Sequence, residues 1–122
     1  MKSVLFLFVL VFSANIINAQ NSLVFEEYKK SLGDLKEGDV GELTFSYKNI
    51  SKEIMLVSEV IPQCGCTVAS FDREPLLVQE KSSLTLFFDS KEKHGLQRKT
   101  VSILLENGER YVLVITANVI SD

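Results

Sequence analysis

The feature that most constrains this chain is an alternation of apolar and polar residues with a period of two, interrupted by turn residues. In the segment 42–48, for example, Leu43, Phe45 and Tyr47 alternate with polar residues. Successive side chains of a β-strand point to opposite faces, so this pattern is typical of strands with one buried face. No stretch has the three-and-four spacing of an amphipathic helix. We therefore expect an all-β chain.

The same criterion predicts strands over 43–47, 54–61, 84–88, 101–105 and 111–119, with shorter ones at 23–28, 67–71 and 76–78. Turns are expected at pairs such as Gly33-Asp34. About seven short antiparallel strands in about 100 residues are typical of an immunoglobulin-like β-sandwich. The expected core contains Phe45, Tyr47, Leu56, Leu84, Leu86, Val101, Ile103, Val112 and Val114. Leu86 and Phe88 should be buried, with Thr85 and Phe87 on the opposite face.

The strongest local signal is Asn107-Gly108, placed between two alternating runs. Asn-Gly is the preferred two-residue β-hairpin loop, because both central positions need a positive φ. A loop of this length pairs Glu106 with Glu109 and places Val112 and Val114 on the core side. The opposite face, with Tyr111, Leu113 and Ile115, is then either covered by the same chain or exposed as a partner surface.

The N-terminal residues predict a secretory signal peptide. Lys2 is followed by an apolar run over 4–12, and the segment ends at Ala19. This order of positive charge, apolar run and small residue is typical of a signal sequence, and the run is shorter than the roughly 20 residues that span a bilayer. We therefore expect a signal peptide at 1–19 and one sandwich domain at 20–122, periplasmic or secreted. No cysteine follows the run, so no lipid anchor and no transmembrane segment are expected.

Charge and composition argue against several functions. The 122 residues include 13 Lys and Arg and 16 Asp and Glu, for a formal net charge of -3. Nucleic-acid-binding domains usually carry a basic patch, so nucleic acid is an improbable partner. The only histidine, His94, lies in a charged segment, and no nucleophile-elbow sequence is present. We therefore expect a protein that is not an enzyme.

The segment Cys64-Gly65-Cys66 is the one chemically unusual motif, and it has three interpretations. The first is a disulfide or redox pair, for which the backbone must bend at Gly65. Glycine permits a tight or left-handed conformation there. Such a small ring would be labile and would contribute little stability. The second interpretation is that the cysteines are small apolar residues filling a tight site between the sheets.

The third interpretation is a soft-metal site, with copper as the cofactor, held by the two thiolates. Within this chain the additional donors are Met55 and His94, both distant in sequence from the cysteines. A tetrahedral zinc site needs four ligands, so one chain supplies too few unless two chains share the ion. No cofactor is expected under the other two interpretations.

Several of these features together resemble a known family. They are Leu32-Gly33, Glu37-Gly38, an alternating strand that ends at Lys48-Asn49, an apolar strand leading into Cys64-Gly65-Cys66-Thr67, then Pro75, residues 84–89 and Gly95. This arrangement is similar to the domain-of-unknown-function family 1573 of secreted bacterial proteins. The resemblance implies an immunoglobulin-like sandwich related to modules of cilia- and centrosome-associated proteins, and it implies no reaction.

Two functional hypotheses remain open at this point. The first is a non-enzymatic binding or structural module of the bacterial cell envelope, whose partner is another envelope protein or a second copy of this chain. Docking would use the face of Tyr111, Leu113 and Ile115 or a free sheet edge. The second hypothesis is thiol redox chemistry or copper handling through Cys64 and Cys66.

Overall fold

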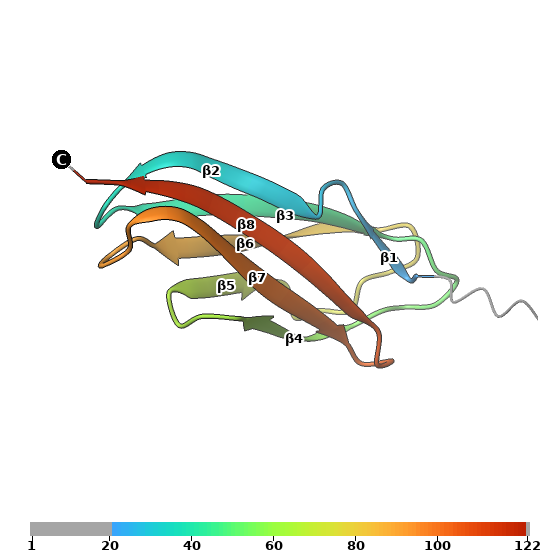
Figure 1. Ribbon diagram of the computed structural model, residues 1–122. Coiled ribbons are helices and arrows are strands. Elements are labelled where there is room, and N and C mark those ends of the chain that lie inside the picture. The colour runs from blue at the N-terminus through green and yellow to red at the C-terminus, as the bar shows by residue number, and fades with distance from the viewer. Residues whose placement is uncertain (1–20, 122) are drawn as a thin grey trace, which may run out of the picture.

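The computed structural model describes residues 21–121, which form eight β-strands and no helix (Figure 1). The predicted signal peptide, residues 1–19, lies outside the described residues, as do Gln20 and Asp122. The strands are β1 (Leu23–Phe25), β2 (Lys29–Lys36), β3 (Val40–Asn49), β4 (Val57–Pro62), β5 (Thr67–Phe71), β6 (Lys81–Asp89), β7 (Gly95–Leu105) and β8 (Arg110–Ile120).

The strands form two four-stranded sheets that pack face to face (Figure 1). Sheet I has the order β1-β3-β6-β5, and sheet II has the order β2-β8-β7-β4. The prediction of an all-β sandwich is confirmed, with eight strands in place of about seven. The predicted short strand at 76–78 is absent: there Leu76 forms only an isolated bridge with Met55.

The central pair of sheet I follows the alternation of its sequence. Strands β3 and β6 are antiparallel, with an unbroken register from Val40–Asp89 to Lys48–Lys81. Leu86 and Phe88 are buried, whereas Thr85 and Phe87 are only partly covered. The predicted phase of this strand is therefore confirmed.

The sequence pattern did not predict strand β2, because Gly33-Asp34 indicated a turn where this strand lies. The chain does bend there: Gly33 has a φ of 67°, and the register shifts between Ser31 and Asp34. The bend is a bulge within a strand that pairs in parallel with β8, so the sandwich is not purely antiparallel. Leu32 packs so closely on β3 that a Cβ atom on Gly41 would lie 2.7 Å from its Cδ1.

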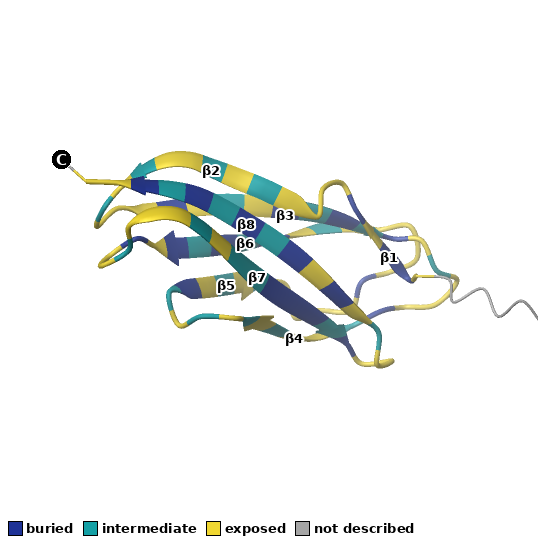
Figure 2. Cartoon of the chain, in the orientation of Figure 1, coloured by how far each residue is buried: buried dark blue, intermediate teal, exposed yellow. Residues whose placement is uncertain are grey.

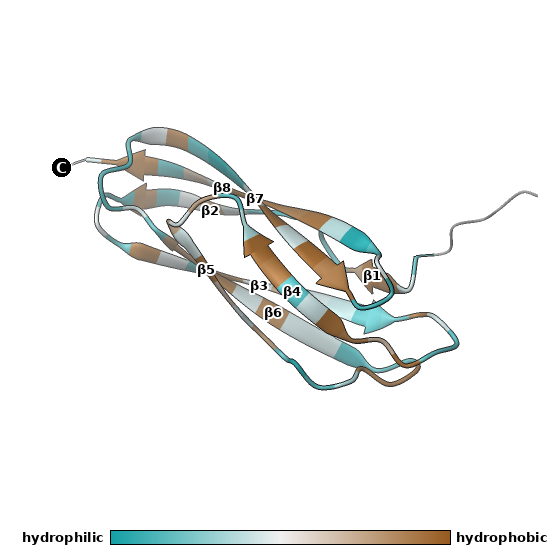
Figure 3. Cartoon of the chain, turned by 90° about the horizontal axis from the view of Figure 1, so that it is seen from below, coloured by the Kyte–Doolittle hydropathy of each residue, from teal (hydrophilic) through white to brown (hydrophobic). Residues whose placement is uncertain are grey.

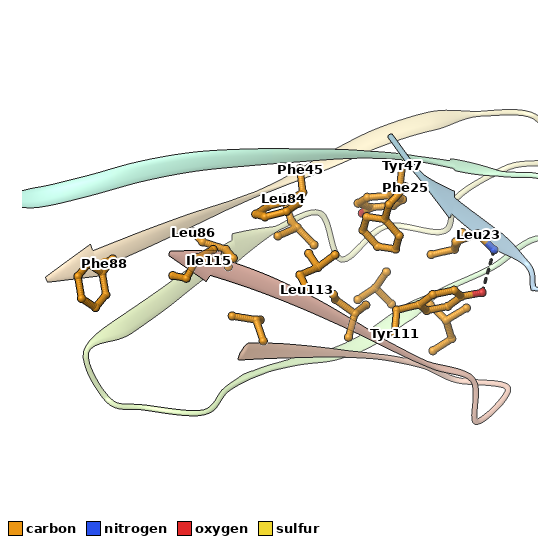
Figure 4. Close-up of a cluster of buried hydrophobic side chains, with 14 of the residues drawn as sticks. Leu23, Phe25, Phe45, Tyr47, Leu84, Leu86, Phe88, Tyr111, Leu113 and Ile115 are labelled. Atoms are coloured by element: carbon orange, nitrogen blue, oxygen red, sulfur yellow. Dashed lines mark hydrogen bonds between the residues drawn. The ribbon is translucent and has the colours of Figure 1, made fainter. Parts of the chain in front are cut away.

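The core lies between the two sheets (Figures 2 and 4). Its aromatic centre is Phe25, whose ring centroid lies 5.2 Å from that of Tyr47 and 5.6 Å from that of Tyr111. Such tilted ring pairs add to the stabilisation from apolar burial. Most of the predicted core is confirmed, namely Phe45, Tyr47, Leu84, Leu86, Val101 and Ile103, and Leu56 is only partly buried.

One buried polar residue at the end of β3 fixes two loops. The side chain of Asn49 is fully buried, and its Nδ2 donates hydrogen bonds to the carbonyl oxygens of Glu53, at 2.8 Å, and Leu76, at 3.0 Å. Its Oδ1 accepts from the backbone N–H of Ser51 at 2.9 Å. Ser51 and Glu53 lie in the loop before β4, and Leu76 lies in the loop before β6. Asn49 therefore holds both loops to the end of β3.

The β7–β8 hairpin differs from its prediction by one residue. Leu104 pairs with Arg110, and the N–H of Leu105 donates to the carbonyl of Glu109 at 3.0 Å. The loop therefore spans 106–108, and Gly108 occupies the left-handed region with a φ of 92°. Three-residue hairpin loops with glycine in this position are the next most common type after two-residue loops.

This one-residue difference reverses the two faces of β8, because a single slip moves every side chain to the opposite side of the sheet. Val112 and Val114 therefore do not belong to the core, contrary to the prediction. Val112 is 46% exposed and Val114 is partly exposed. The alternation of buried and more exposed residues along β8 is visible in Figure 2.

Candidate functional site

The Cys64-Gly65-Cys66 motif lies in the connection between β4 and β5, which are edge strands of different sheets. The two cysteines form a disulfide, and their Cα atoms lie 5.1 Å apart, within the ordinary range for such a bridge. In a straight strand this separation would be about 6.6 Å. The chain therefore turns within the motif as it crosses from one sheet to the other.

Backbone hydrogen bonds hold both sides of the motif. On one side, the N–H of Gln63 donates to the carbonyl of Thr100 at 2.9 Å, and the Gln63 Oε1 accepts from the N–H of Thr100 at 3.1 Å. On the other side, the N–H of Asp89 donates to the carbonyl of Cys66 at 2.8 Å. The loop is thus attached to β7 and to the end of β6 independently of the disulfide.

The two sulfur atoms have different surroundings. The backbone N–H of Cys66 donates a hydrogen bond to Cys64 Sγ at 3.0 Å. Cys66 packs against the hydrophobic core, and its Sγ lies 3.9 Å from the hydroxyl of Thr67. Both cysteines are half-buried. The disulfide therefore has one sulfur beside a backbone donor and one beside the core.

Gly65 is exposed, and of the two expected backbone conformations, tight or left-handed, it does not adopt the left-handed one. Its φ is outside the left-handed region that the other loop glycines occupy, and a Cβ atom built on it would meet nothing within 4 Å beyond its two neighbours. Neither a left-handed φ nor packing against other parts of the described chain therefore requires a glycine here.

The additional metal donors do not gather around the motif. Met55 precedes β4 whereas Cys64 follows it, so the two lie at opposite ends of that strand. His94 lies in the β6–β7 connection, with its Nδ1 3.7 Å from the carboxylate of Glu37. Within residues 21–121 no group of three or more His, Cys, Asp and Glu side chains is arranged to hold a metal ion.

The predicted partner surface of Tyr111, Leu113 and Ile115 is wrong. All three side chains are buried, with exposures of 7%, 0% and 2%, and they face sheet I across the core (Figure 4). The three-residue hairpin loop is the physical cause, since it turns the other face of β8 outward. The surface that this reversal leaves open carries Leu104, Val112 and Val114.

These residues form part of an apolar strip on the outer face of sheet II, which we define as Ile61, Leu104, Val112 and Val114. The register places Ile61, Ser102 and Val112 in one row across β4, β7 and β8. Ile61 is 47% exposed, and the apolar segments of β4 and β7 lie side by side in Figure 3. The sequence indicated an apolar outer face on this hairpin but did not reveal which one, and it gave no sign that Ile61 joins it.

Charged residues flank the apolar strip. The exposed charges nearest the strip are Arg98, Arg110, Lys29 and one carboxylate, Glu59, and Asp34 and Lys36 lie farther along the same outer face. The Arg110 guanidinium donates to the hydroxyl of Ser102 at 2.8 Å, and because Ser102 lies between Ile61 and Val112 in the row, the guanidinium lies within the strip. This part of an otherwise acidic protein is therefore locally positive.

A polar cluster at the hairpin end of the sandwich ties the start of β1 to the β7–β8 hairpin. The carboxylate of Glu109 accepts hydrogen bonds from the hydroxyls of Ser22 and Tyr111, both at 2.8 Å. Tyr111 in turn accepts from the N–H of Leu23 at 3.0 Å (Figure 4). Burial and the bond to Glu109 raise the pKa of Tyr111 to about 12. Burial alone would raise the pKa of Glu109, but these hydrogen bonds outweigh it and lower that pKa.

The comparison with known families is decisive for the identity of the chain. Residues 23–119 match the family described as "Protein of unknown function (DUF1573)", a segment that extends from β1 into β8. The chain belongs to this family. The resemblance inferred from the sequence is confirmed, and the match includes both the disulfide loop and the apolar strip of this DUF1573 domain.

Solved structures share the fold of this DUF1573 domain at low sequence identity. The protease VesB of Vibrio cholerae has a TM-score of 0.67 and 15% identity, over 80% of this chain and 32% of that one. A protein of unknown function from Porphyromonas gingivalis W83 has a TM-score of 0.68 and 12% identity, over 84% of this chain and 51% of that one. The ASH / PapD-like domain 7 of human CEP192 has a TM-score of 0.65 and 8% identity, over 83% of this chain and 87% of that one.

These identities establish a shared fold alone, that of an immunoglobulin-like and PapD-like sandwich. The DUF1573 chain spans about a third and about a half of the first two solved chains that it matches. No curated protein matches it. None of residues 21–121 belongs to a helix of the length and apolar character that crossing a membrane requires.

Proposed function

We propose that this chain is an exported, non-enzymatic binding module of the bacterial cell envelope that docks a partner polypeptide on the apolar strip. The observation that carries the proposal is the outward orientation of Ile61 and Val112, which are 47% and 46% exposed in one row of sheet II. Apolar residues grouped on a surface and rimmed by polar ones are typical of protein contact sites. The solved chains that share this fold include a protease, but a shared fold does not assign an activity to this chain.

The charges around the strip specify the chemistry of the partner. Three cationic residues and one carboxylate surround the strip, whereas the chain as a whole carries a net charge of -3. Opposite charges around an apolar centre steer association and fix orientation. The proposed partner is therefore a polypeptide that presents apolar side chains flanked by carboxylates, and its binding weakens as salt concentration rises.

Site-specific photo-crosslinking in cells that naturally produce the protein tests this proposal. A benzophenone amino acid replaces Val112 in the full chain, and a matched control replaces Val68, which is 62% exposed on the outer face of sheet I. We expect one discrete adduct from position 112 and none from position 68. The charge reversal Arg110→Glu, introduced together with the position-112 label, should reduce the adduct.

Other outcomes contradict the proposal in different ways. Equal adducts from positions 112 and 68 would mean that the strip has no special role. An adduct with twice the mass of the chain would show that the partner is a second copy of this chain and not a different, carboxylate-bearing polypeptide. Insensitivity of the adduct to Arg110→Glu would refute the assignment of partner charge.

A further inference from the structure

We propose that the Cys64–Cys66 disulfide is a thiol–disulfide exchange site for polypeptides that carry a cysteine pair, with Cys64 as the exchanging sulfur and Cys66 as the resolving one. This inference goes beyond the binding function and does not depend on the apolar strip. Three observations support it: the minor structural role of the bridge, the different surroundings of the two sulfurs, and the open space at Gly65.

The bridge contributes little to the fold. It joins residues separated by two positions, and a disulfide stabilises a protein mainly by closing a long loop in the unfolded chain. The loop is already held by the hydrogen bonds of Gln63 to Thr100 and of Asp89 to Cys66. Reduction therefore leaves the two thiols facing each other at a fixed spacing, ready to form the bridge again.

The hydrogen bonding assigns different roles to the two sulfurs. The Cys66 N–H points at Cys64 Sγ from 3.0 Å, and a backbone donor stabilises a thiolate more than a thiol. A sulfur with more thiolate character at neutral pH attacks disulfides faster. Cys66 instead packs against the core, which suits a thiol that reacts only with its neighbour.

Gly65 gives a partner access to this pair. The open space beside it is not needed for φ or for packing within the chain. Exchange requires the attacking sulfur, the central sulfur and the leaving sulfur to approach each other, so a second polypeptide must come close to the bridge. A glycine between the cysteines permits that approach.

The reaction balances as a reversible two-electron exchange. The Cys64 thiolate attacks one sulfur of the partner's disulfide, a new S–S bond forms, and the partner's other sulfur leaves as a thiolate. The Cys66 thiolate then attacks Cys64 Sγ, the mixed disulfide breaks, and the partner's second sulfur leaves. The chain is oxidised and loses two thiol protons and two electrons, and the partner gains them as two thiols.

The test compares three purified proteins: the wild type, Cys64→Ser and Cys66→Ser. Each is mixed with a peptide, quenched with acid and weighed by mass spectrometry. With a peptide whose single cysteine is held in a mixed disulfide with a small thiol, which leaves on attack, reduced Cys66→Ser should accumulate a peptide adduct about tenfold faster than reduced Cys64→Ser, because one hydrogen bond to a charged group favours the Cys64 thiolate. The wild type, taken in its disulfide form and mixed with a peptide that carries a Cys-x-x-Cys dithiol, should oxidise the peptide and gain two hydrogens without a lasting adduct, because the small ring is the more labile disulfide.

Thermal unfolding of the same proteins separates exchange from a structural role. The reduced wild type and both serine variants should melt within a few degrees of the oxidised protein. Equal adduct rates for the two variants, or a wild-type disulfide that leaves an excess of the peptide dithiol unoxidised, would overturn the proposal. A collapse of the melting temperature on reduction would overturn it as well, because the bridge would then be structural.

A size series at Gly65 tests the access argument. Gly65→Ala and Gly65→Val should progressively slow exchange with the peptide while leaving exchange with oxidised glutathione, a smaller disulfide, nearly unchanged. The control Ser70→Val places a valine at an exposed position of β5 and should affect neither probe. An unaltered peptide rate in Gly65→Val would refute the role of the open space.

Discussion

The orientation of β8 can be tested with two adjacent alanine substitutions, Leu113→Ala and Val112→Ala. Leu113 is 0% exposed and lies between the sheets, whereas Val112 is 46% exposed on the outer face of sheet II. The predicted two-residue hairpin would have reversed these environments. The relative cost of the two substitutions therefore reports directly on the register of the hairpin.

The two substitutions are expected to lower the free energy of unfolding by amounts that differ severalfold. Removing a leucine side chain from a closed core costs about 3 kcal/mol, since the transfer free energy and the residual cavity both count. Val112→Ala removes two methyl groups that are about half covered, which corresponds to about 0.8 kcal/mol. For a domain of this size these values correspond to losses of about 15 °C and about 5 °C in melting temperature.

Urea unfolding followed by circular dichroism provides the free energies of unfolding, with the slope m monitored to confirm that both variants unfold as the wild type does. A cost for Val112→Ala that equals or exceeds the cost for Leu113→Ala would refute the three-residue loop. The apolar strip would then lose its outward residues on β8, and the proposed docking surface would fail with it.

Three further substitutions test other parts of the structure. The pKa of Glu109 is lowered in the folded state, so its contribution to stability is present above the ordinary pKa of 4.5 and is lost as pH falls; Glu109→Gln should flatten the acid limb of the free energy of unfolding against pH, and an unchanged limb would contradict this. Gly41→Ala should lower the melting temperature modestly, because its Cβ would lie 2.7 Å from the methyl groups of Leu32, the flexible end of a partly exposed side chain that must turn aside; Gly65→Ala, with open space around it, serves as the neutral control, and equal melting temperatures would contradict the close packing. Asn49→Ala should cost about 3 kcal/mol in urea unfolding, because the hydrogen bonds of its side chain to the carbonyls of Glu53 and Leu76 and to the N–H of Ser51 are lost at about 1 kcal/mol each, and a cost below about 1 kcal/mol would show that water or the remaining donors to these carbonyls compensate.

The general architecture could be predicted because local patterns decide it. In β3 and β6 one face is apolar and the other polar, so only one phase buries Phe45, Leu84 and Leu86. The strand β2 could not be predicted in the same way. Its bulge at Gly33 and its parallel pairing with β8 depend on a strand more than seventy residues away, and no local signal carries that information.

For the disulfide motif, too, the sequence revealed one part and only the tertiary structure revealed the other. Two cysteines at this spacing in one loop were recognisable as an unusual feature of the sequence. Their unequal surroundings were not, because the N–H bond to Cys64 Sγ and the packing of Cys66 on the core arise from the crossing between two sheets. The length of β4 separates Met55 from the cysteines, because Met55 precedes that strand and the cysteines follow it.

The sequence by itself determined the all-β class, the family and the position of the disulfide motif, because alternation and motif spacing are properties of short segments. Only the tertiary structure decided which face of β8 is buried. Both faces of that strand are largely apolar, with Tyr111, Leu113 and Ile115 on one and Val112 and Val114 on the other. Hydrophobicity alone could not choose between them, so the length of one hairpin loop decided it.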